Sequence, residues 1–243
     1  MVLKVLNSNS SGNGYVLESK DEKLLLECGL KPLELKKAID FDLSGVAGCL
    51  LTHEHLDHSK YMNDYAKMGI DIYSSKGTFG DKENHRFKVK KSGDKFSVGK
   101  FKVIAFDVKH DAREPFGYMI NHEECGNVLF VTDSYYTQYN FKGLNNIIVE
   151  ANYCKDILLD KLVNGKIMPF LYKRIVDSHM SIQTCMDLLK ANDLSAVNNI
   201  VLIHLSNSNS DERRFKTMVE ESTFKNVHVA NRDMVIDFNL TPY

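Results

Sequence analysis

The chain has 243 residues, of which 43% are hydrophobic and 26% are charged, and its formal net charge is −1 at pH 7. That length allows one large domain or two small ones, and no apolar run approaches the ~20 residues of a membrane-spanning helix. Proteins that track a long phosphate backbone usually carry a basic excess, so tight non-specific nucleic-acid binding is disfavoured. Residues 1–14 become polar too early for a secretory signal, and we expect a cytoplasmic protein with no membrane partner.

The first half of the chain is predicted to be rich in β-strands, because short apolar runs alternate with turn-forming residues. These strands are expected at residues 2–6, 15–19, 22–29, 45–52, 70–75, 117–134 (as a hairpin) and 145–152, with a polar turn at 7–14. Residues 86–109 are expected to add two or three strands. The lysines of residues 85–103 either lie there as solvated charges or contact nucleic acid. Helices are predicted at residues 31–39 and 59–69.

The second half of the chain is predicted to be mainly helical, because its apolar residues recur at helical intervals. These helices are expected at residues 154–163, 169–178, 181–193 and 211–223. Two further strands are expected, one at the start of residues 198–210 and one at residues 226–230. No linker or internal repeat divides the chain, so we expect residues 1–243 to form one domain with sheets sandwiched between helices.

The most unusual segment is residues 50–60, LLTHEHLDHSK, where His53, His55, Asp57 and His58 directly follow an apolar run. Imidazoles packed this closely repel one another once protonated, so a bound cation is the simplest compensation. Imidazole with carboxylate suits zinc and also tolerates iron or manganese. The five cysteines are scattered without a CxxC pair, so thiolate ligands are not expected.

Further ligand-type residues each follow a strand-like apolar run. His110 comes after VIAFDVK, Asp133 after VLFVT, and His204 after IVLI. A single histidine at a strand end is most simply a surface residue. The carboxyl ends of strands converge on the functional crevice of layered α/β proteins, however, so four such ends together predict a buried metal site.

The motif THEHLDH resembles the HxHxDH signature of the metallo-β-lactamase fold. The segments HDAREPFGY, FVTDS, VEANY, SHMS and IHLS follow in the order found in the nuclease and phosphodiesterase branch that includes ribonuclease Z. The opening LNSNSSGNGYVLES makes the chain most similar to the short, YycJ-like exonuclease-type group. Two features depart from that pattern: Glu27 replaces the usual aspartate, and Asn7 and Asn9 replace loop glycines.

This resemblance implies an αββα sandwich that holds two divalent metal ions, with Zn²⁺ expected and Mn²⁺ as the alternative. By the same resemblance, one ion is bound by His53, His55 and His110, the other by Asp57, His58 and His204, and Asp133 bridges them. Glu27 is expected to hydrogen-bond a ligand histidine and fix its tautomer, or else to be an ordinary acid at a strand end.

Two more residues are implied to take part in catalysis. His179 corresponds to a histidine that is not a ligand but assists the leaving oxygen, and Glu150 corresponds to the glutamate that orients it. Asp57 is expected to accept the proton of the attacking water as well as to bind metal. In the alternative interpretation, His179 lies at a helix N-terminus capped by Ser178 or Ser181.

Polar loops near these residues allow two interpretations as well. Ser8, Ser10, Ser11 and Asn13, together with residues 206–209, either form a phosphate-binding rim or are simple polar turns.

The expected function is a metal-dependent hydrolase that cleaves phosphodiester bonds with metal-activated hydroxide. Its substrate is expected to be a nucleic acid end or a cyclic nucleotide, because the near-neutral charge and the lack of a long inserted arm disfavour a tRNA-end processor. One alternative is a carbonyl-ester hydrolase, such as a lactonase or thioesterase, on the same two metals. Another is a catalytically idle, metal-bound binding module. A homodimer is compatible with the sequence.

Overall fold

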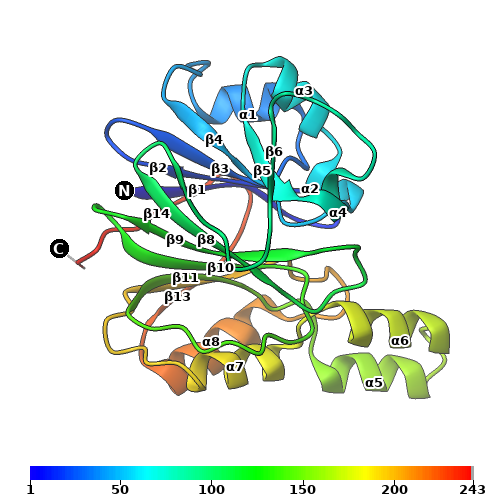
Figure 1. Ribbon diagram of the computed structural model, residues 1–243. Coiled ribbons are helices and arrows are strands. Elements are labelled where there is room, and N and C mark those ends of the chain that lie inside the picture. Colours follow the sequence, from blue (N-terminus) through cyan, green and yellow to red (C-terminus); the bar gives the residue numbers. More distant parts are fainter. Residues whose placement is uncertain (242–243) are drawn as a thin grey trace.

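The computed structural model describes residues 1–241, which form two seven-stranded mixed sheets packed face to face between two layers of helices (Figure 1). The predicted αββα sandwich is confirmed. The first sheet contains, in spatial order, β14 (Met234–Asp237), β1 (Val2–Asn9), β2 (Gly12–Glu18), β3 (Lys23–Leu26), β4 (Val46–Leu50), β5 (Ile72–Ser75) and β6 (Phe87–Lys90). The second contains β13 (Asn226–Val229), β12 (Asn199–Ile203), β11 (Leu144–Glu150), β10 (Gly126–Val131), β9 (Phe116–His122), β8 (Phe101–Asp107) and β7 (Lys95–Val98).

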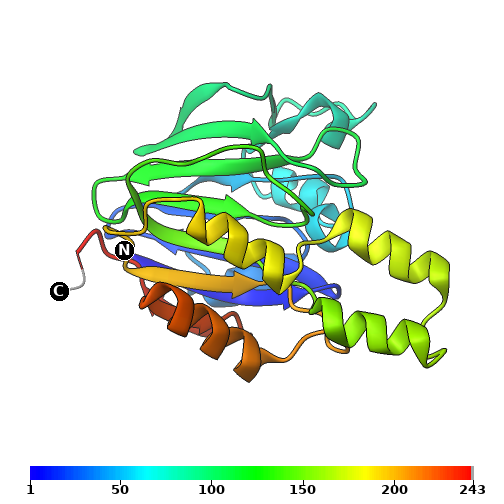
Figure 2. The same ribbon diagram turned by 90° about the horizontal axis from the view of Figure 1, so that it is seen from below.

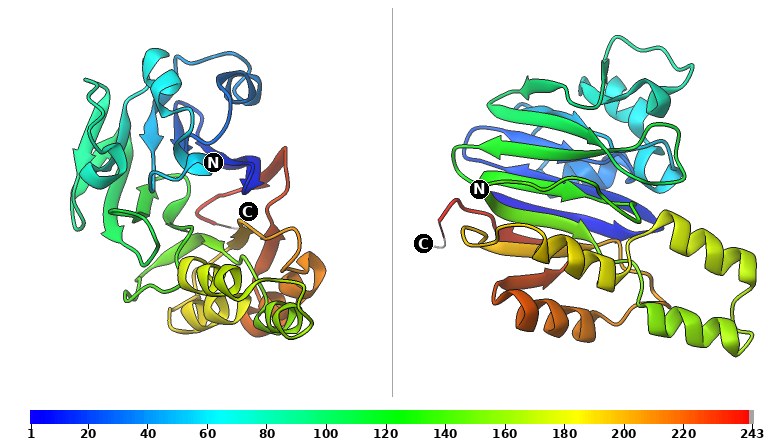
Figure 3. Two further views of the ribbon diagram at one scale, coloured as in Figure 1. Left: turned by 90° about the vertical axis from the view of Figure 1, so that its right-hand side faces the viewer. Right: turned by 60° about the horizontal axis from the view of Figure 1, so that its bottom comes forward.

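The helices form the outer layers, as the turned view in Figure 2 makes clear. On the side of the first sheet lie α1 (Pro32–Ala38), α2 (Leu56–Ser59), α3 (Met62–Lys67) and α4 (Lys76–Phe79). On the side of the second sheet lie α5 (Lys155–Val163), α6 (Pro169–Ser178), α7 (Ile182–Lys190) and α8 (Glu212–Thr223). The α5–α6 pair projects beyond the sheets as a helical hairpin (Figures 2 and 3). No helix within residues 1–241 is long and apolar enough to cross a membrane.

Three hydrophobic clusters hold the described layers together, one between the sheets and one under each helical layer. In the cluster between the sheets, the ring of Tyr15 on β2 meets the ring of Phe130 on β10 edge-on, with 5.9 Å between centroids. Strands β3 to β6 are mutually parallel, and so are β10 to β13. Parallel strands end at the same edge of a sheet, so the loops after β4, β10, β11 and β12 meet at one side of the sandwich.

The N-terminal hairpin differs from its prediction. Residues 7–14 were expected to be a turn, but Asn7 to Asn9 continue β1 and Gly12 to Gly14 continue β2. The side-chain amide of Asn7 donates to the carbonyl of Gly12 at 2.6 Å, which holds the two strand ends together across a two-residue turn.

Three helix and strand predictions also need correction. The helix expected at 59–69 is shortened to α3, and α2, which was not predicted, ends at Ser59. The two helices are separated because the N–H of Tyr61 donates to the carbonyl of Cys28 at 2.9 Å. Helix α4 follows β5 directly and was not predicted. Strand β14 was also missed, because only Ile236 of its four residues is buried and the segment lacks a strong apolar pattern. It becomes a strand by pairing with β1.

Stability is expected to depend on the packing between the sheets. Replacing Phe130 by alanine removes a fully buried ring and should lower the free energy of unfolding by about 3–5 kcal/mol. Phe170→Ala on the projecting hairpin is the matched control, because that ring is 71% exposed and should matter little. Urea unfolding of both variants measures the difference; equal midpoints would contradict this account of the core.

Candidate active site

The first histidine of the segment, His53, lies three residues after the end of β4, and the segment continues into the short helix α2. His53 lies in the loop, His55 is the residue before the first turn of α2, and Asp57 and His58 lie within that helix. His53 and His58 are almost completely buried, whereas Asp57 is partly exposed. The spacing of the motif therefore places these side chains around one point, since the strand sets the start of the loop and one helical turn sets its end.

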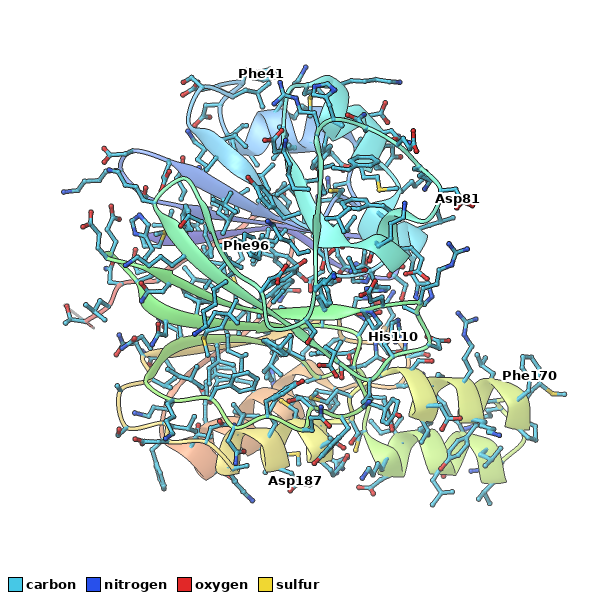
Figure 4. All side chains as sticks on the ribbon, viewed as in Figure 1. Phe41, Asp81, Phe96, His110, Phe170 and Asp187 are labelled. Atoms are coloured by element: carbon cyan, nitrogen blue, oxygen red, sulfur yellow. The ribbon has the colours of Figure 1, made fainter. Side chains whose placement is uncertain are left out.

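The other predicted residues reach the same region from the second sheet. His110 follows β8, Asp133 follows β10, Glu150 ends β11, and His204 follows β12. Figure 4 shows His110 at the end of the sandwich where the α5–α6 hairpin leaves the body. His179 is the residue directly after α6 and thus joins the site from a helix rather than a strand.

All seven predicted metal ligands come together in two overlapping clusters. The nearest ligand atoms of the first cluster lie within 4.8 Å of one another, and its members are His53, His55, His110 and Asp133. The second cluster meets the same limit, and its members are Asp57, His58, Asp133 and His204. Asp133 belongs to both, as a bridging carboxylate would. These clustered residues are suited to binding metal ions.

A third cluster of the same size contains Asp133, Glu150, His179 and His204. Within it, Nδ1 of His179 lies 2.7 Å from Oε1 of Glu150 but 3.8 Å from Oδ2 of Asp133. The nitrogen of His179 that approaches the cluster is therefore already hydrogen-bonded to Glu150. This contact favours an oriented histidine beside the metal clusters rather than another ligand.

A hydrogen-bond relay leaves one nitrogen of His53 free for a metal. The hydroxyl of Thr52 donates to Oε1 of Glu27 at 2.6 Å, so its oxygen accepts the Nδ1 proton of His53 at 2.9 Å. That tautomer carries a lone pair on Nε2, which is buried without a hydrogen-bond partner among the described residues. An unpaired buried polar atom costs about 1–3 kcal/mol, and metal ligation would remove that cost.

His110 is oriented by the backbone in the same way. Its Nδ1 donates to the carbonyl of Ser178 at 2.8 Å, and its Nε2 lies 3.1 Å from Nδ1 of His55. With its proton committed to Ser178, His110 presents a lone pair toward His55 and the first cluster. The donor set of both clusters thus fits divalent ions that accept nitrogen and oxygen ligands.

The electrostatic environments of the two clusters differ. Burial would raise the pKa of Asp133, but His204 and His58 hold it well below its usual range. Burial would lower the pKa of His204, but Asp133 and Asp57 raise it to about 10. In the first cluster, burial lowers the pKa of His53 and of His110. Protons therefore collect in the second cluster, and a metal ion binding there would displace them.

Three site residues have left-handed backbone conformations that the sequence did not reveal. Glu27, Asp133 and His204 have φ values of 70°, 43° and 55°. Such conformations cost on the order of 1–3 kcal/mol each in non-glycine residues and persist only where contacts enforce them. At His204, the backbone N–H donates to the hydroxyl of Ser8 at 2.8 Å.

Several contacts that support the site were not predicted from the sequence. Ser8 and Asn13 were expected either to line a phosphate-binding rim or to be polar turn residues; in addition, Ser8 holds the backbone of His204, and the Asn13 amide contacts Oδ2 of Asp57 at 3.3 Å. Asn152 was not singled out, although its amide donates to the carbonyl of His204 at 2.8 Å. Thr52 was missed too, and its position directly before His53 was the available signal.

The contacts of Glu27 and of the SHMS segment agree only in part with what was expected from the sequence. Glu27 reaches His53 only through Thr52 and lies 3.5 Å from Nδ1 of His58. Ser181 is confirmed as the N-cap of α7, since its hydroxyl accepts from the N–H of Thr184. The cap prediction for Ser178 is wrong, because that residue ends α6.

Comparison with known proteins identifies the family to which the chain belongs. A family model described as a beta-lactamase superfamily domain matches residues 23–205. The chain therefore belongs to the beta-lactamase superfamily, and with this cluster of histidines and aspartates it is a metallo-hydrolase of that superfamily. The resemblance to the metallo-β-lactamase fold seen in the sequence is confirmed.

Individual relatives are similar over much of the chain. The exodeoxyribonuclease WalJ of Streptococcus pneumoniae serotype 2 (strain D39 / NCTC 7466) is 30% identical over 237 residues, which cover 89% of this chain and 86% of that protein. The exodeoxyribonuclease YycJ of Bacillus anthracis is 31% identical over 170 residues, and the match spans 63% of this chain and 64% of that relative's length. Among solved structures, the metallo-beta-lactamase fold protein YhfI of Bacillus subtilis superposes with a TM-score of 0.73 at 17% identity, covering 97% of this chain and 98% of YhfI.

Asp133→Ala tests the shared carboxylate. Because Asp133 belongs to both clusters, its loss should reduce bound metal to less than half of the wild-type content. Elemental analysis after metal loading and gel filtration measures this, with Asp64→Ala on α3 as an exposed control. Unchanged metal content in Asp133→Ala would contradict the bridging position.

Thr52→Val tests the relay from Glu27 to His53. The substitution keeps the shape of the side chain but leaves the Nδ1 proton of His53 without an acceptor. Losses of such supporting contacts typically lower metal affinity by about 10- to 100-fold. Competition with a chromogenic chelator measures the affinity. Thr78→Val, the same change at another buried threonine, should leave it unaltered.

Proposed function

We propose that this protein is a two-metal phosphodiesterase that hydrolyses DNA at strand ends. The observation that carries the proposal is the His179–Glu150 pair, held 2.7 Å apart beside the shared Asp133. Cleavage of a phosphodiester produces an alkoxide leaving group that benefits from a positioned proton donor. The two relatives named exodeoxyribonuclease, at 30% and 31% identity, support DNA as the substrate.

The proposed ligand sets follow the two clusters. We assign His53, His55 and His110 to one ion, Asp57, His58 and His204 to the other, and Asp133 to both. Zn²⁺ is the preferred ion for this set of nitrogen and oxygen donors, with Mn²⁺ as the alternative. When bound, such a pair of ions acidifies a water molecule and neutralises charge on the attacked phosphoryl oxygens.

His179 is suited to protonating the leaving oxygen. Its side chain is 22% exposed, so a substrate can reach it. Burial would lower its pKa, but Glu150 and Asp133 outweigh burial and raise the pKa above the usual value. The ring therefore holds its proton to a higher pH than a free imidazole does. With Nδ1 bonded to Glu150, the Nε2 proton remains for donation to the substrate.

Glu150 is itself held in place. Its Oε2 accepts from the backbone N–H groups of Ser134 at 2.9 Å and Met180 at 3.0 Å, while its Oε1 faces His179. These contacts prevent the carboxylate from rotating and fix the direction of the imidazole ring. A positioned acid of this kind is typically worth ~100- to 10,000-fold in rate.

Asp57 is the proposed acceptor of the proton released by the attacking water. Burial would raise its pKa, but hydrogen bonds from His204 and His58 hold it far below the usual range, so the carboxylate is ionised. It is also the most accessible of the ligands in the second cluster, at 22% side-chain exposure. In this mechanism Asp57 accepts a proton and His179 donates one, and both residues belong to the same network of histidines and carboxylates.

The His179–Glu150 pair also separates this proposal from its alternatives. A lactonase or thioesterase on the same metals has less need of an added acid for its leaving group, and an idle binding module has no need of one. Cyclic nucleotides contain the same phosphodiester bond, and a direct assay distinguishes them from DNA ends. We further propose that residues 1–243 act as one domain in the cytoplasm.

His179→Ala tests the role of the proposed acid. The variant should keep both metals but lose ~100- to 10,000-fold in turnover of labelled DNA, because the leaving oxygen is no longer protonated. With bis-p-nitrophenyl phosphate the loss should be smaller, since nitrophenolate leaves readily without a proton. His85→Ala, at an exposed histidine outside the site, should behave as wild type. Undiminished DNA cleavage by His179→Ala would refute the role of the imidazole.

A further inference from the structure

A cavity of about 530 Å³ lies between the loop after Asp133 and one face of α7. The loop contributes three tyrosines and two amides, and α7 contributes residues spaced by three or four positions, which share one side of a helix. In Figure 4, Asp187 marks the outer side of α7, and this face is distant from Phe170 on the projecting hairpin. None of these cavity residues has a role in the proposed chemistry.

Glu150 anchors the backbone at the start of both segments that line the cavity. The loop wall starts at Ser134 and the helix wall at Met180, and the backbone N–H groups of both residues donate to Oε2 of Glu150. The cavity residue Tyr135 follows Ser134 directly, and Met180 follows His179. Because adjacent Cα atoms are only ~3.8 Å apart, one end of the cavity adjoins the proposed acid.

The side chains in the cavity match the surface of a nucleobase. Tyr135 and Tyr136 are 42% and 54% exposed, and within residues 1–241 neither ring stacks on another ring. The third ring, Tyr139, is fixed by a hydrogen bond from its hydroxyl to Asp107. In the described part of the chain, the side chains of Asn140 and Asp187 have no hydrogen-bond partner, which leaves an amide and a carboxylate for base edges.

We propose that this cavity, here called the tyrosine pocket, binds the nucleobase of a nucleotide next to the phosphodiester that is cleaved. This proposal rests on the proposed function and adds a base-binding subsite to it. Stacking on tyrosine tolerates every base because each has a π-face, whereas Asn140 and Asp187 would contribute preference among bases. The chain is nearly neutral overall, so base stacking supplies affinity that a basic groove would otherwise provide.

Binding is tested with metal-loaded protein and a single-stranded oligonucleotide that carries 2-aminopurine at one terminus and a phosphorothioate at the terminal linkage to slow cleavage. Stacking on tyrosine should quench the fluorescence when the label is at one of the two ends, measured in turn. The double variant Tyr135→Ala/Tyr136→Ala should abolish the quenching, Tyr135→Phe/Tyr136→Phe should retain it, and Phe170→Ala should match wild type. Absence of quenching at both ends in the wild-type protein would overturn the proposal.

Cleavage of abasic ends provides a second, independent test. With wild-type protein, replacing the terminal nucleotide by an abasic tetrahydrofuran residue should raise KM by ~10-fold or more, the effect expected for loss of one stacked base. In Tyr135→Ala/Tyr136→Ala, the normal end should already show that KM, and the abasic end should add little, because both changes remove one interaction. Equal KM values for normal and abasic ends in the wild-type protein would overturn the pocket.

The two proposals fail in different ways. DNA cleavage that is lost in Asp133→Ala but indifferent to the terminal base would remove the tyrosine pocket and leave the nuclease intact. Base-dependent quenching without any DNA cleavage would remove the proposed nuclease function and leave a base-binding cavity.

Discussion

The burial of Asp133 is the constraint around which the site is organised. A carboxylate that is only 2% exposed costs several kcal/mol unless opposite charge and hydrogen bonds compensate it. Nitrogen atoms of five imidazoles lie within 3.3–3.8 Å of its oxygens, from His53, His58, His110, His179 and His204. These histidines come from both sheets and from a helix end, so the position of Asp133 links the layers of the sandwich to the chemistry between them.

Glu150 organises the adjoining part of the molecule in a similar way. It orients His179 through one oxygen and anchors the backbone at Ser134 and Met180 through the other. The proposed acid and one end of the tyrosine pocket are therefore held by the same carboxylate. In the proposed mechanism, a substitution at Glu150 disturbs leaving-group protonation and base binding together, whereas a change at Tyr135 or Tyr136 affects base binding alone.

The site also depends on strained backbone conformations and on hydrogen bonds from residues outside the two ligand clusters. Glu27, Asp133 and His204 have left-handed backbone conformations just beyond the ends of β3, β10 and β12. Contacts from Thr52 and Ser8 then hold the ring of His53 and the backbone of His204. Such support holds the clustered histidines and carboxylates in fixed positions, as a binding site requires.

The sequence by itself determined the class of fold and predicted which ligand-type residues gather at one site, whereas the pairing of His179 with Glu150 was implied by the family resemblance. The HxHxDH spacing is local, and His110, Asp133 and His204 each follow a recognisable apolar strand, but His179 follows a helix and carried no such signal. Only the tertiary structure decided three features: the pairing of β14 with β1, the contact of the Asn13 amide with Asp57, and the cavity called the tyrosine pocket. These features depend on contacts between distant segments, such as the bond from His204 to Ser8 across 196 positions, for which a linear pattern holds no signal.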